Sequence, residues 1–233
     1  MQKLNSSGVE GMGNKVVFLD VGGTLVDFQP PYHRPILETL RKHGFNLDEK
    51  SVFRAIARQF GNNFKPNYES GLLKPDFRSL ILDLTGETPS NQILEELERT
   101  SLLGTSYALY SDSLPFLRWI KESGFKVVLV TNASPSMHRV IKELGVFSYI
   151  EGLVASCDLG VMKPHPDIFK EAAKIAGPPL LHIGDTYEVD YVGAKNAGYE
   201  AVLVDRQNYY DDVKAVKVRS LLEVMDLMGS THS

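Results

Sequence analysis

The chain has 233 residues, 43% of them hydrophobic and 23% charged, with a formal net charge of −4. This composition is ordinary for a globular protein, and it argues against nucleic acid or a membrane surface as a partner. The single cysteine, Cys157, excludes an internal disulfide, and no apolar run is long enough to span a bilayer. We therefore expect a cytoplasmic monomer or homodimer in which Cys157 is a small buried apolar residue.

The first 14 residues are polar and rich in Gly and Ser, and they lack the apolar stretch of a secretion signal. We expect a disordered tail over 1–14. After it, five short apolar runs end in polar residues or glycine, and each has the length of a strand: 15–20, 126–131, 149–154, 180–185 and 200–205. The last four alternate with helical patterns, as in βαβ units, which predicts an α/β fold with a three-layer, Rossmann-like parallel sheet.

About 105 residues separate the first two strands, far more than an ordinary connection needs. Four amphipathic patterns fill this interval, and 30–100 contains no convincing strand; the patterns cover 35–43, 48–60, 75–85 and 90–100. A further helix over 113–123 returns the chain to the sheet.

These patterns predict three parts: the tail, a core of 15–27 with 113–233, and an inserted all-helical cap over 28–112. The polar and aromatic loop 61–74 is a candidate lid segment, although a solvated loop is the more ordinary interpretation.

Polar residues stand where the predicted strands end, and in an open parallel sheet these ends converge on one binding edge. They include Asp20 after the first strand, Thr131 and Asn132 after the second, and Asp185 after the fourth. Taken singly, an Asp or Thr in such a place is more often a helix cap than a catalytic group. Their combined spacing gives them more weight.

Four sequence segments resemble the motifs of the haloacid dehalogenase superfamily, in the same order. They are VVFLDVGGTLVD around Asp20, VVLVTN ending at Thr131 and Asn132, GVMKPHPDIF around Lys163, and GDTYEVDYVGAKNAG with Asp185 and Asp190. The inserted helices lie between the first and second motifs, where this superfamily carries a helical cap. The resemblance implies a hydrolase of the phosphatase-like branch.

In this resemblance Asp20 is the nucleophile that forms an aspartyl-phosphate, which divides a difficult hydrolysis into two displacements. Mg²⁺ prefers oxygen ligands, and the resemblance assigns it the carboxylates of Asp20 and Asp185 with the backbone carbonyl of Gly22. The substrate is then a small phosphorylated molecule.

The remaining motif residues surround the phosphate in this scheme. Lys163 offsets its negative charge, and Thr131 with Asn132 holds its oxygens, so that Asp20, Thr131 and Lys163 form the catalytic set. Asp190 orients Lys163 or a metal-bound water. Individually, Lys163 would be interpreted as a surface lysine and Asp190 as an acid in the first turn of a helix.

One position departs from the family pattern: the family's general acid and base, an Asp, is replaced by Gly22. A positioned acid contributes about 10²–10⁴ in rate, so the substitution favours substrates with good leaving groups or a substitute such as Asp27 or His33. A binding protein for phosphorylated ligands with little turnover is the second reading.

A 2-haloacid dehalogenase is the third reading, because the family's dehalogenases carry a bulky aromatic residue instead of Gly22 and lack the Asp185 carboxylate. Phosphonate cleavage would further require a cap lysine such as Lys65 or Lys74.

Overall fold

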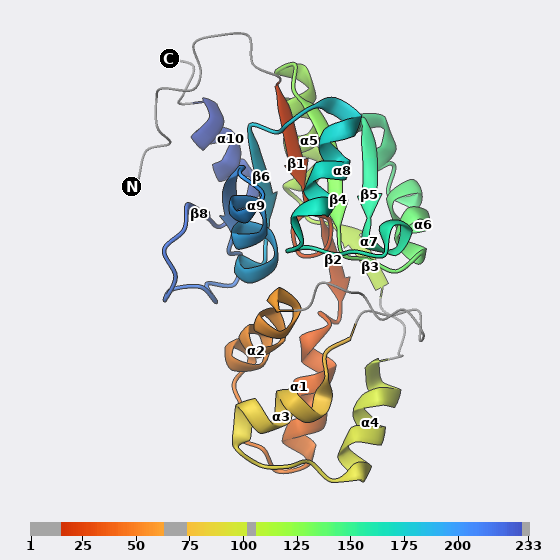
Figure 1. Ribbon diagram of the computed structural model, residues 1–233, viewed down its shortest axis with the longest axis vertical. Coiled ribbons are helices and arrows are strands. Elements are labelled where there is room, and N and C mark those ends of the chain that lie inside the picture. Colours follow the sequence, from red (N-terminus) through yellow and green to blue (C-terminus); the bar gives the residue numbers. More distant parts are fainter. Residues whose placement is uncertain (1–14, 63–73, 102–105, 230–233) are drawn as a thin grey trace.

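The computed structural model describes residues 15–62, 74–101 and 106–229, so the predicted tail lies outside the described residues. Its centre is a parallel sheet in the order β5-β4-β1-β6-β7-β8, as predicted for a Rossmann-like α/β core (Figure 1). The strands are β1 (Val16–Leu19), β4 (Lys126–Thr131), β5 (Gly152–Ala155), β6 (Leu181–Gly184), β7 (Glu200–Val204) and β8 (Lys217–Val218).

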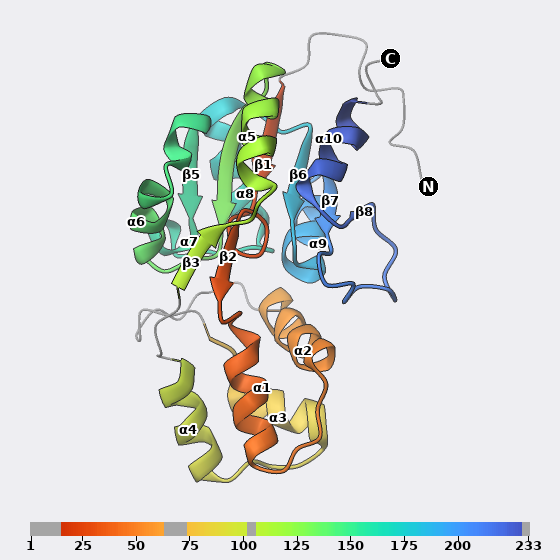
Figure 2. The same ribbon diagram turned by 180° about the vertical axis from the view of Figure 1, so that it is seen from behind.

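Apolar side chains of the central strands alternate between the two faces of the sheet. On β1, Val17 and Leu19 pack into one hydrophobic layer and Val16 and Phe18 into the other, as the two-residue repeat of a strand requires. The first layer is covered by α5 (Ser113–Glu122), α6 (Ser136–Glu143) and α10 (Leu221–Gly229), the second by α8 (Pro166–Ala176) and α9 (Val192–Asn196) (Figure 2). These are the three layers expected from the sequence.

The strand order places β1 between β4 and β6, so that Leu19 pairs with Leu129 on one side and with Ile183 on the other. From β1 the chain proceeds outward through β4 and β5, and then crosses to the other side with β6, β7 and β8. The carboxyl end of β1 is therefore the point at which the strand order reverses, where ligands bind in such sheets.

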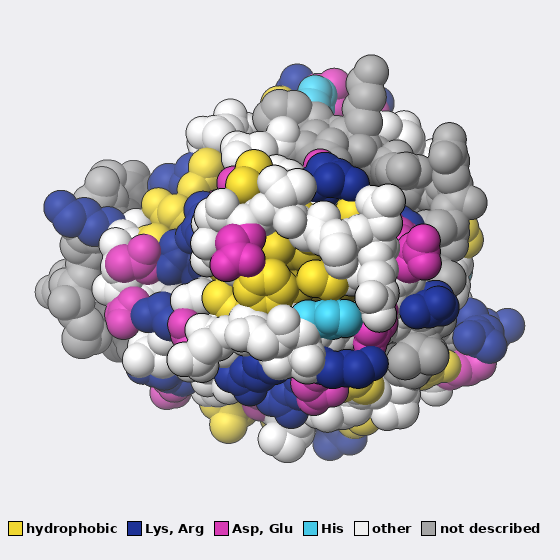
Figure 3. Space-filling model, turned by 90° about the horizontal axis from the view of Figure 1, so that it is seen from below, with side chains coloured by type: hydrophobic (Ala, Val, Ile, Leu, Met, Phe, Trp, Pro, Cys, Tyr) yellow, Lys and Arg dark blue, Asp and Glu magenta, His cyan; other side chains and the backbone are white. Residues whose placement is uncertain are grey.

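Four helices form the inserted cap, which lies below the core in Figure 1: α1 (His33–Lys42), α2 (Glu49–Gly61), α3 (Phe77–Thr85) and α4 (Asn91–Ser101). They bury an apolar cluster of their own, which includes Leu40, Ile56 and Leu80. On the outer face of the cap, hydrophobic side chains gather at the centre and charged ones surround them (Figure 3).

Polar side chains cap the starts of two cap helices, and a glycine ends one of them. Asp48 accepts a hydrogen bond from the Ser51 backbone N–H at the start of α2, and Asp76 does the same at the start of α3. Gly86 ends α3 with φ of 75°, a conformation that suits glycine. The first cap helix begins at His33, two residues before the predicted start.

Two short strands connect the cap to the core. β2 (Val26–Gln29) and β3 (Ser106–Leu109) pair antiparallel, and this small sheet was not predicted. Each strand has four residues, too few to display a clear alternation in the sequence. The proposed boundaries of the cap, residues 28 and 112, stay a prediction.

Three further segments differ from the predictions. Within the predicted strand 149–154, the strand β5 begins only at Gly152, and it follows a 3₁₀ turn (Val146–Tyr149). Tyr149 and Ile150 extended the apolar run because they pack against the core. A π-helical turn (Tyr187–Tyr191) precedes α9, and a short helix, α7 (Ser156–Leu159), follows β5. β8 and α10 lie in a part of the chain for which no element was predicted. Among the described residues, no helix is long and apolar enough to cross a membrane.

Candidate active site

Asp20 lies directly after β1, at the reversal point of the sheet. Its backbone N–H donates to the Ile183 carbonyl at 2.8 Å, and the Thr24 hydroxyl donates to one carboxylate oxygen at 3.2 Å. The carboxylate lines a cavity of about 410 Å³ to which both core and cap contribute. The buried strand β1 thus presents a fixed carboxylate to an enclosed space, as expected from its place in the sequence.

Lys163 connects the first and fourth motifs. Its ammonium donates to Asp20 Oδ1 and to Asp190 Oδ1, both at 2.6 Å, and the side chain is 1% exposed. Asp190 also accepts from His182 Nε2 at 2.9 Å and from the Thr186 backbone N–H at 3.1 Å. Lys163 is therefore not a surface lysine: it is a buried cation held between two carboxylates.

Three carboxylates, of Asp20, Asp185 and Asp190, surround the ammonium of Lys163, which leaves an excess of negative charge. Burial raises the pKa of Asp20 to about 6, although Lys163 opposes the rise. Burial would also raise the pKa of Asp190, but Lys163 and His182 outweigh it and lower that pKa to about 2. The pKa of Asp185 stands well above its ordinary value, through desolvation and then through Asp20 and Asp190. Lys163 is shared between Asp20 and Asp190, and Asp185 forms no ion pair among the described residues, so a bound cation would offset the excess negative charge.

The geometry around these two carboxylates suits a divalent ion. Carboxylate oxygens of Asp20, Asp185 and Asp190 lie within 4.8 Å of one another. A Cβ on Gly23, which has φ of 77°, would lie 2.2 Å from an Asp185 oxygen, so only glycine permits this approach of the nucleophile loop. Mg²⁺ prefers oxygen ligands in a near-octahedral arrangement, and these carboxylates offer oxygen atoms at fixed positions.

The second motif contributes through both of its polar residues. Thr131 is buried at the end of β4 and lines the cavity. The Asn132 side chain donates to the Lys163 carbonyl at 2.8 Å and accepts from the Lys163 N–H at 2.7 Å. Asn132 thus fixes the loop that carries Lys163, and its predicted contact with phosphate stays a prediction.

At the position of the missing acid, Gly22 also lines the cavity. A Cβ built there would lie 3.3 Å from the Phe28 ring, and the backbone of Gly22 is not in the left-handed region. Both suggested substitutes, Asp27 on β2 and His33 at the start of α1, line the same cavity.

A buried arginine that the sequence analysis did not identify holds the nucleophile loop. Arg206 donates to the carbonyls of Gly23 and Thr24, at 3.2 and 2.8 Å, and pairs with both carboxylate oxygens of Asp112. Its guanidinium lies 4.0 Å from the centre of the Tyr110 ring. Arg206 lies two residues after β7, so the rule that polar residues at strand ends converge on one edge could have predicted its place in the site. No comparable pattern in the sequence indicates Asp112 or Tyr110.

Other predicted positions lie apart from this site. Cys157 is half-exposed rather than buried, and its thiol, 3.5 Å from Asp158, lies in an exposed group with His138. Lys74 pairs with Glu98 and does not line the cavity, and Lys65 lies outside the described residues, as do residues 63–73 generally.

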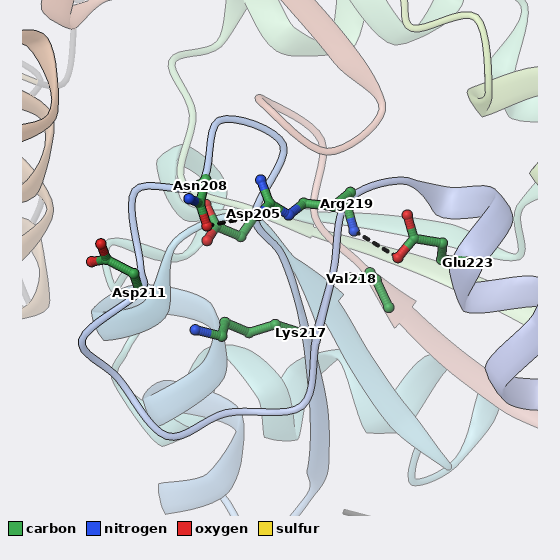
Figure 4. Close-up of a pocket in the computed structure, with 7 residues that line it drawn as sticks. All are labelled: Asp205, Asn208, Asp211, Lys217, Val218, Arg219 and Glu223. Atoms are coloured by element: carbon green, nitrogen blue, oxygen red, sulfur yellow. Dashed lines mark hydrogen bonds between the residues drawn. The ribbon is translucent and has the colours of Figure 1, made fainter. Parts of the chain in front are cut away.

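A second cavity, of about 360 Å³, lies beside β8 and contains none of the predicted site residues (Figure 4). Its polar groups are used internally: Asp205 accepts from the backbone N–H groups of Tyr209 and Tyr210, and Glu223 accepts from that of Arg219. This internal hydrogen bonding gives no indication of a ligand. The cavity around Asp20 is the candidate active site.

The chain resembles known proteins over most of its length. The chain is 28% identical to a glyceraldehyde 3-phosphate phosphatase of Pyrococcus abyssi, over 81% of this chain and 80% of the relative. Among solved structures, a predicted phosphoglycolate phosphatase from Haemophilus somnus has a TM-score of 0.62 at 18% identity, covering 94% of this chain and all of the other (100%). A 2-haloacid dehalogenase from Pseudomonas syringae has a TM-score of 0.55 at 19% identity, with coverages of 94% and 99%.

At such identities the structural likenesses show the fold and do not separate the two activities. The family assignment rests on a model of haloacid dehalogenase-like hydrolases, which matches residues 14–198. This interval contains all four motifs, with Asp20, Lys163, Asp185 and Asp190. The chain therefore belongs to the haloacid dehalogenase-like hydrolase family.

Proposed function

We propose that this protein is a magnesium-dependent phosphatase that acts on a small phosphorylated molecule through an aspartyl-phosphate at Asp20. The observation that carries the proposal is the convergence of Asp20, Lys163 and Asp185 at the reversal point of the sheet, in a cavity that residues of the core and the cap line together. A nucleophilic carboxylate, a buried cation and a free carboxylate are the parts that phosphoryl transfer needs.

Each residue then has a separate task. Asp20 attacks phosphorus with one carboxylate oxygen, and the bond from phosphorus to the leaving oxygen breaks. Lys163, with the Thr131 hydroxyl, stabilises the charge on the phosphoryl oxygens. Asp190 and Asn132 hold Lys163 from opposite ends, at its ammonium and at its backbone. Because Lys163 is fixed before the substrate arrives, little reorganisation is required during the reaction.

A magnesium ion would offset the excess negative charge of the carboxylates in this site. Asp20, Asp185 and the Gly22 carbonyl are the groups that would hold it, and Gly23 permits their close approach. When bound, the ion would neutralise charge on the phosphoryl group. Its charge would also lower the pKa of Asp20, which must be ionised in order to attack.

The size of the cavity and the named relative support a small phosphorylated substrate. A volume of about 410 Å³ accommodates a metabolite rather than a polymer. The Pyrococcus abyssi relative is a glyceraldehyde 3-phosphate phosphatase, and it resembles this chain over four fifths of both lengths, 81% and 80%. We accordingly infer phosphate esters of few carbon atoms as the substrate class.

The retained Asp185 disfavours dehalogenation as the activity. Halide displacement by Asp20 needs no metal, and an additional carboxylate beside it would only repel the ionised nucleophile. In the described residues no positive side chain forms an ion pair with Asp185. That arrangement is costly unless a cation binds, which favours the phosphatase and the phospholigand-binding protein over the dehalogenase.

Hydrolysis assays with and without magnesium test the proposal. Wild-type protein with Mg²⁺ is expected to release phosphate from aryl, acyl and short alkyl phosphates, and chelation should abolish the release. Asp20→Asn should abolish turnover while leaving the circular dichroism spectrum unchanged, because it removes the nucleophile at nearly constant volume.

Three results would contradict the proposal in different ways. Phosphate release by Asp20→Asn at the wild-type rate would exclude Asp20 as nucleophile. Halide release from 2-haloacids in the presence of chelator, without phosphate release from any ester, would establish dehalogenation instead. Magnesium-dependent binding of phosphate esters without turnover would identify a phospholigand-binding protein.

A further inference from the structure

The missing acid at Gly22 raises the question of which cavity residue transfers protons. Of the two substitutes named from the sequence, His33 is committed to the cap. Its Nε2 lies 2.9 Å from Glu49, and because a carboxylate only accepts, Nε2 carries the hydrogen. Burial lowers the pKa of His33, and its ring packs edge-on against Phe53. Its other nitrogen, Nδ1, is buried and has no hydrogen-bond partner among the described residues.

Asp27 has the opposite surroundings. It is half-buried on β2 and lines the cavity together with Asp20 and Gly22. The turn between nucleophile and β2 is tightly bonded, since the Gly23 N–H donates to the Val26 carbonyl at 2.9 Å. Asp27 is therefore attached rigidly, through its own backbone, to the loop that carries the nucleophile.

Tyr110 and Gln29 hold the Asp27 carboxylate in place. Gln29 Nε2 donates to Asp27 Oδ2 at 2.6 Å, and the Tyr110 hydroxyl lies near the same carboxylate, whose negative charge raises the pKa of Tyr110 after the larger effect of burial. Tyr110 is itself fixed: its N–H donates to the Leu25 carbonyl at 3.0 Å, and its ring stacks on Arg206. Since Arg206 also holds the carbonyls of Gly23 and Thr24, one group of contacts positions both Asp27 and the nucleophile loop.

The Gln29 amide nitrogen is a donor, so the Asp27 oxygen that it contacts acts as a hydrogen-bond acceptor. An ionised carboxylate accepts a proton readily but has none to give to a leaving group. The arrangement around Asp27 therefore suits a general base and is unsuited to a general acid.

From this geometry we propose that Asp27 is the general base for the second half of the reaction, with Tyr110 as its positioning residue. The inference rests on the proposed phosphatase function. In this step a water oxygen forms a bond to phosphorus, and the bond from phosphorus to Asp20 breaks. The proton of the water passes to Asp27, inorganic phosphate leaves, and Asp27 later releases the proton to solvent.

The first half of the reaction then proceeds without an acid from the protein. When the bond from phosphorus to the leaving oxygen breaks, that oxygen keeps the electron pair and takes a proton from water. Aryl and acyl phosphates tolerate this, because their leaving groups are stable as anions. With Gly22 in place of the usual Asp, no residue protonates the leaving group in the first half of the reaction. Asp27 supplies only the second proton transfer, the deprotonation of the attacking water.

Rapid-quench kinetics with an aryl phosphate and magnesium separate the two halves. Asp27→Asn is expected to release one equivalent of the aryl alcohol in a burst at close to the wild-type rate. Its steady-state turnover should then fall by roughly 10²–10⁴-fold, with phosphoenzyme accumulating in acid-quenched samples. Tyr110→Phe should give a smaller fall with the burst intact, and Asp27→Glu should recover part of the turnover. Asp83→Asn makes the same chemical change on an exposed part of α3 and should leave both phases unchanged.

The outcomes distinguish this inference from the function on which it rests. If wild-type protein forms no phosphoenzyme and releases no phosphate, the proposed function fails. If wild-type protein turns over and Asp27→Asn does so equally fast, Asp27 is not the base. If Asp27→Asn and Tyr110→Phe both lose the burst as well as the steady-state turnover, the inference also fails. The two residues would then be needed to form the phosphoenzyme and not only to hydrolyse it.

Discussion

Two adjacent glycines in the nucleophile loop differ in what they permit. At Gly23 a side chain is impossible without displacing Asp185, because a Cβ would lie 2.2 Å from its carboxylate oxygen. At Gly22 the backbone accepts any residue, and a Cβ would need only a small adjustment of Phe28, 3.3 Å away. The absence of the acid is therefore not forced by the backbone.

This difference gives a prediction at Gly22. Gly22→Asp should restore acid catalysis and raise kcat/KM on alkyl phosphates by up to about 10²–10⁴-fold, with a smaller gain on aryl phosphates, whose leaving groups need less protonation. The measurement pairs rates on one alkyl and one aryl ester with a thermal melt. Gly22→Asn, which has the same size but no proton to donate, is the matched control.

An intact, magnesium-binding Gly22→Asp protein without preferential gain on the alkyl ester would contradict the argument. Like-charge repulsion from Asp20 limits the gain unless the pKa of the new carboxyl rises, which is what an acid requires. Gly23→Ala, in contrast, should lose magnesium-dependent activity.

At the scale of elements, α2 packs against the π-helical turn Tyr187–Tyr191 of the core. Arg54 is buried between the two, where it donates to the Tyr209 carbonyl at 3.0 Å and pairs with Asp212 and Glu188. Its guanidinium lies 4.5 Å from the centre of the Tyr210 ring. At the end of the same helix, a Cβ on Gly61 would lie 2.6 Å from Glu188 Cβ, so the helix and the π-helical turn pack closely.

Arg54 therefore provides a test of cap docking. Arg54→Ala should lower the free energy of unfolding by about 1–3 kcal/mol, because it leaves partly buried acceptors without a donor. Arg58→Ala, an exposed site one turn further along α2, should have little effect. Chemical denaturation of both variants measures the difference, and equal stabilities would mean that Arg54 contributes nothing to docking.

At the scale of the whole molecule, the active site opposes stability. The pKa of Asp20 is about 6 in the folded protein against an ordinary 3.8, through burial that Lys163 only partly offsets. Between these values the folded state holds a proton that the unfolded state releases, so stability is lost as pH rises through about 6. Below 3.8 both states are protonated and the group contributes no difference.

The prediction is that Asp20→Asn melts at a higher temperature than wild type at pH 8 in metal-free buffer. The difference should disappear below the ordinary pKa of 3.8, where a protonated Asp20 resembles asparagine. Magnesium should raise the melting temperature of wild type more than that of the variant, because it binds the ionised carboxylate. If the variant melts at a lower temperature than wild type at pH 8, the ion pair with Lys163 fully offsets the free-energy cost of burying the ionised Asp20.

The sequence by itself determined the layered core, the inserted helical cap and the convergence of Asp20, Thr131 and Asp185, and the resemblance of its motifs to the family added Lys163 and Asp190. It did so because strand and helix periodicities are local, and because the carboxyl ends of neighbouring parallel strands must meet. Only the tertiary structure decided which distant groups support this site. Arg206 and Asp112 are 94 residues apart in sequence, and Tyr110 reaches Asp27 only because β2 pairs with β3. These contacts depend on how the elements pack against one another, and no spacing within a single segment specifies that packing.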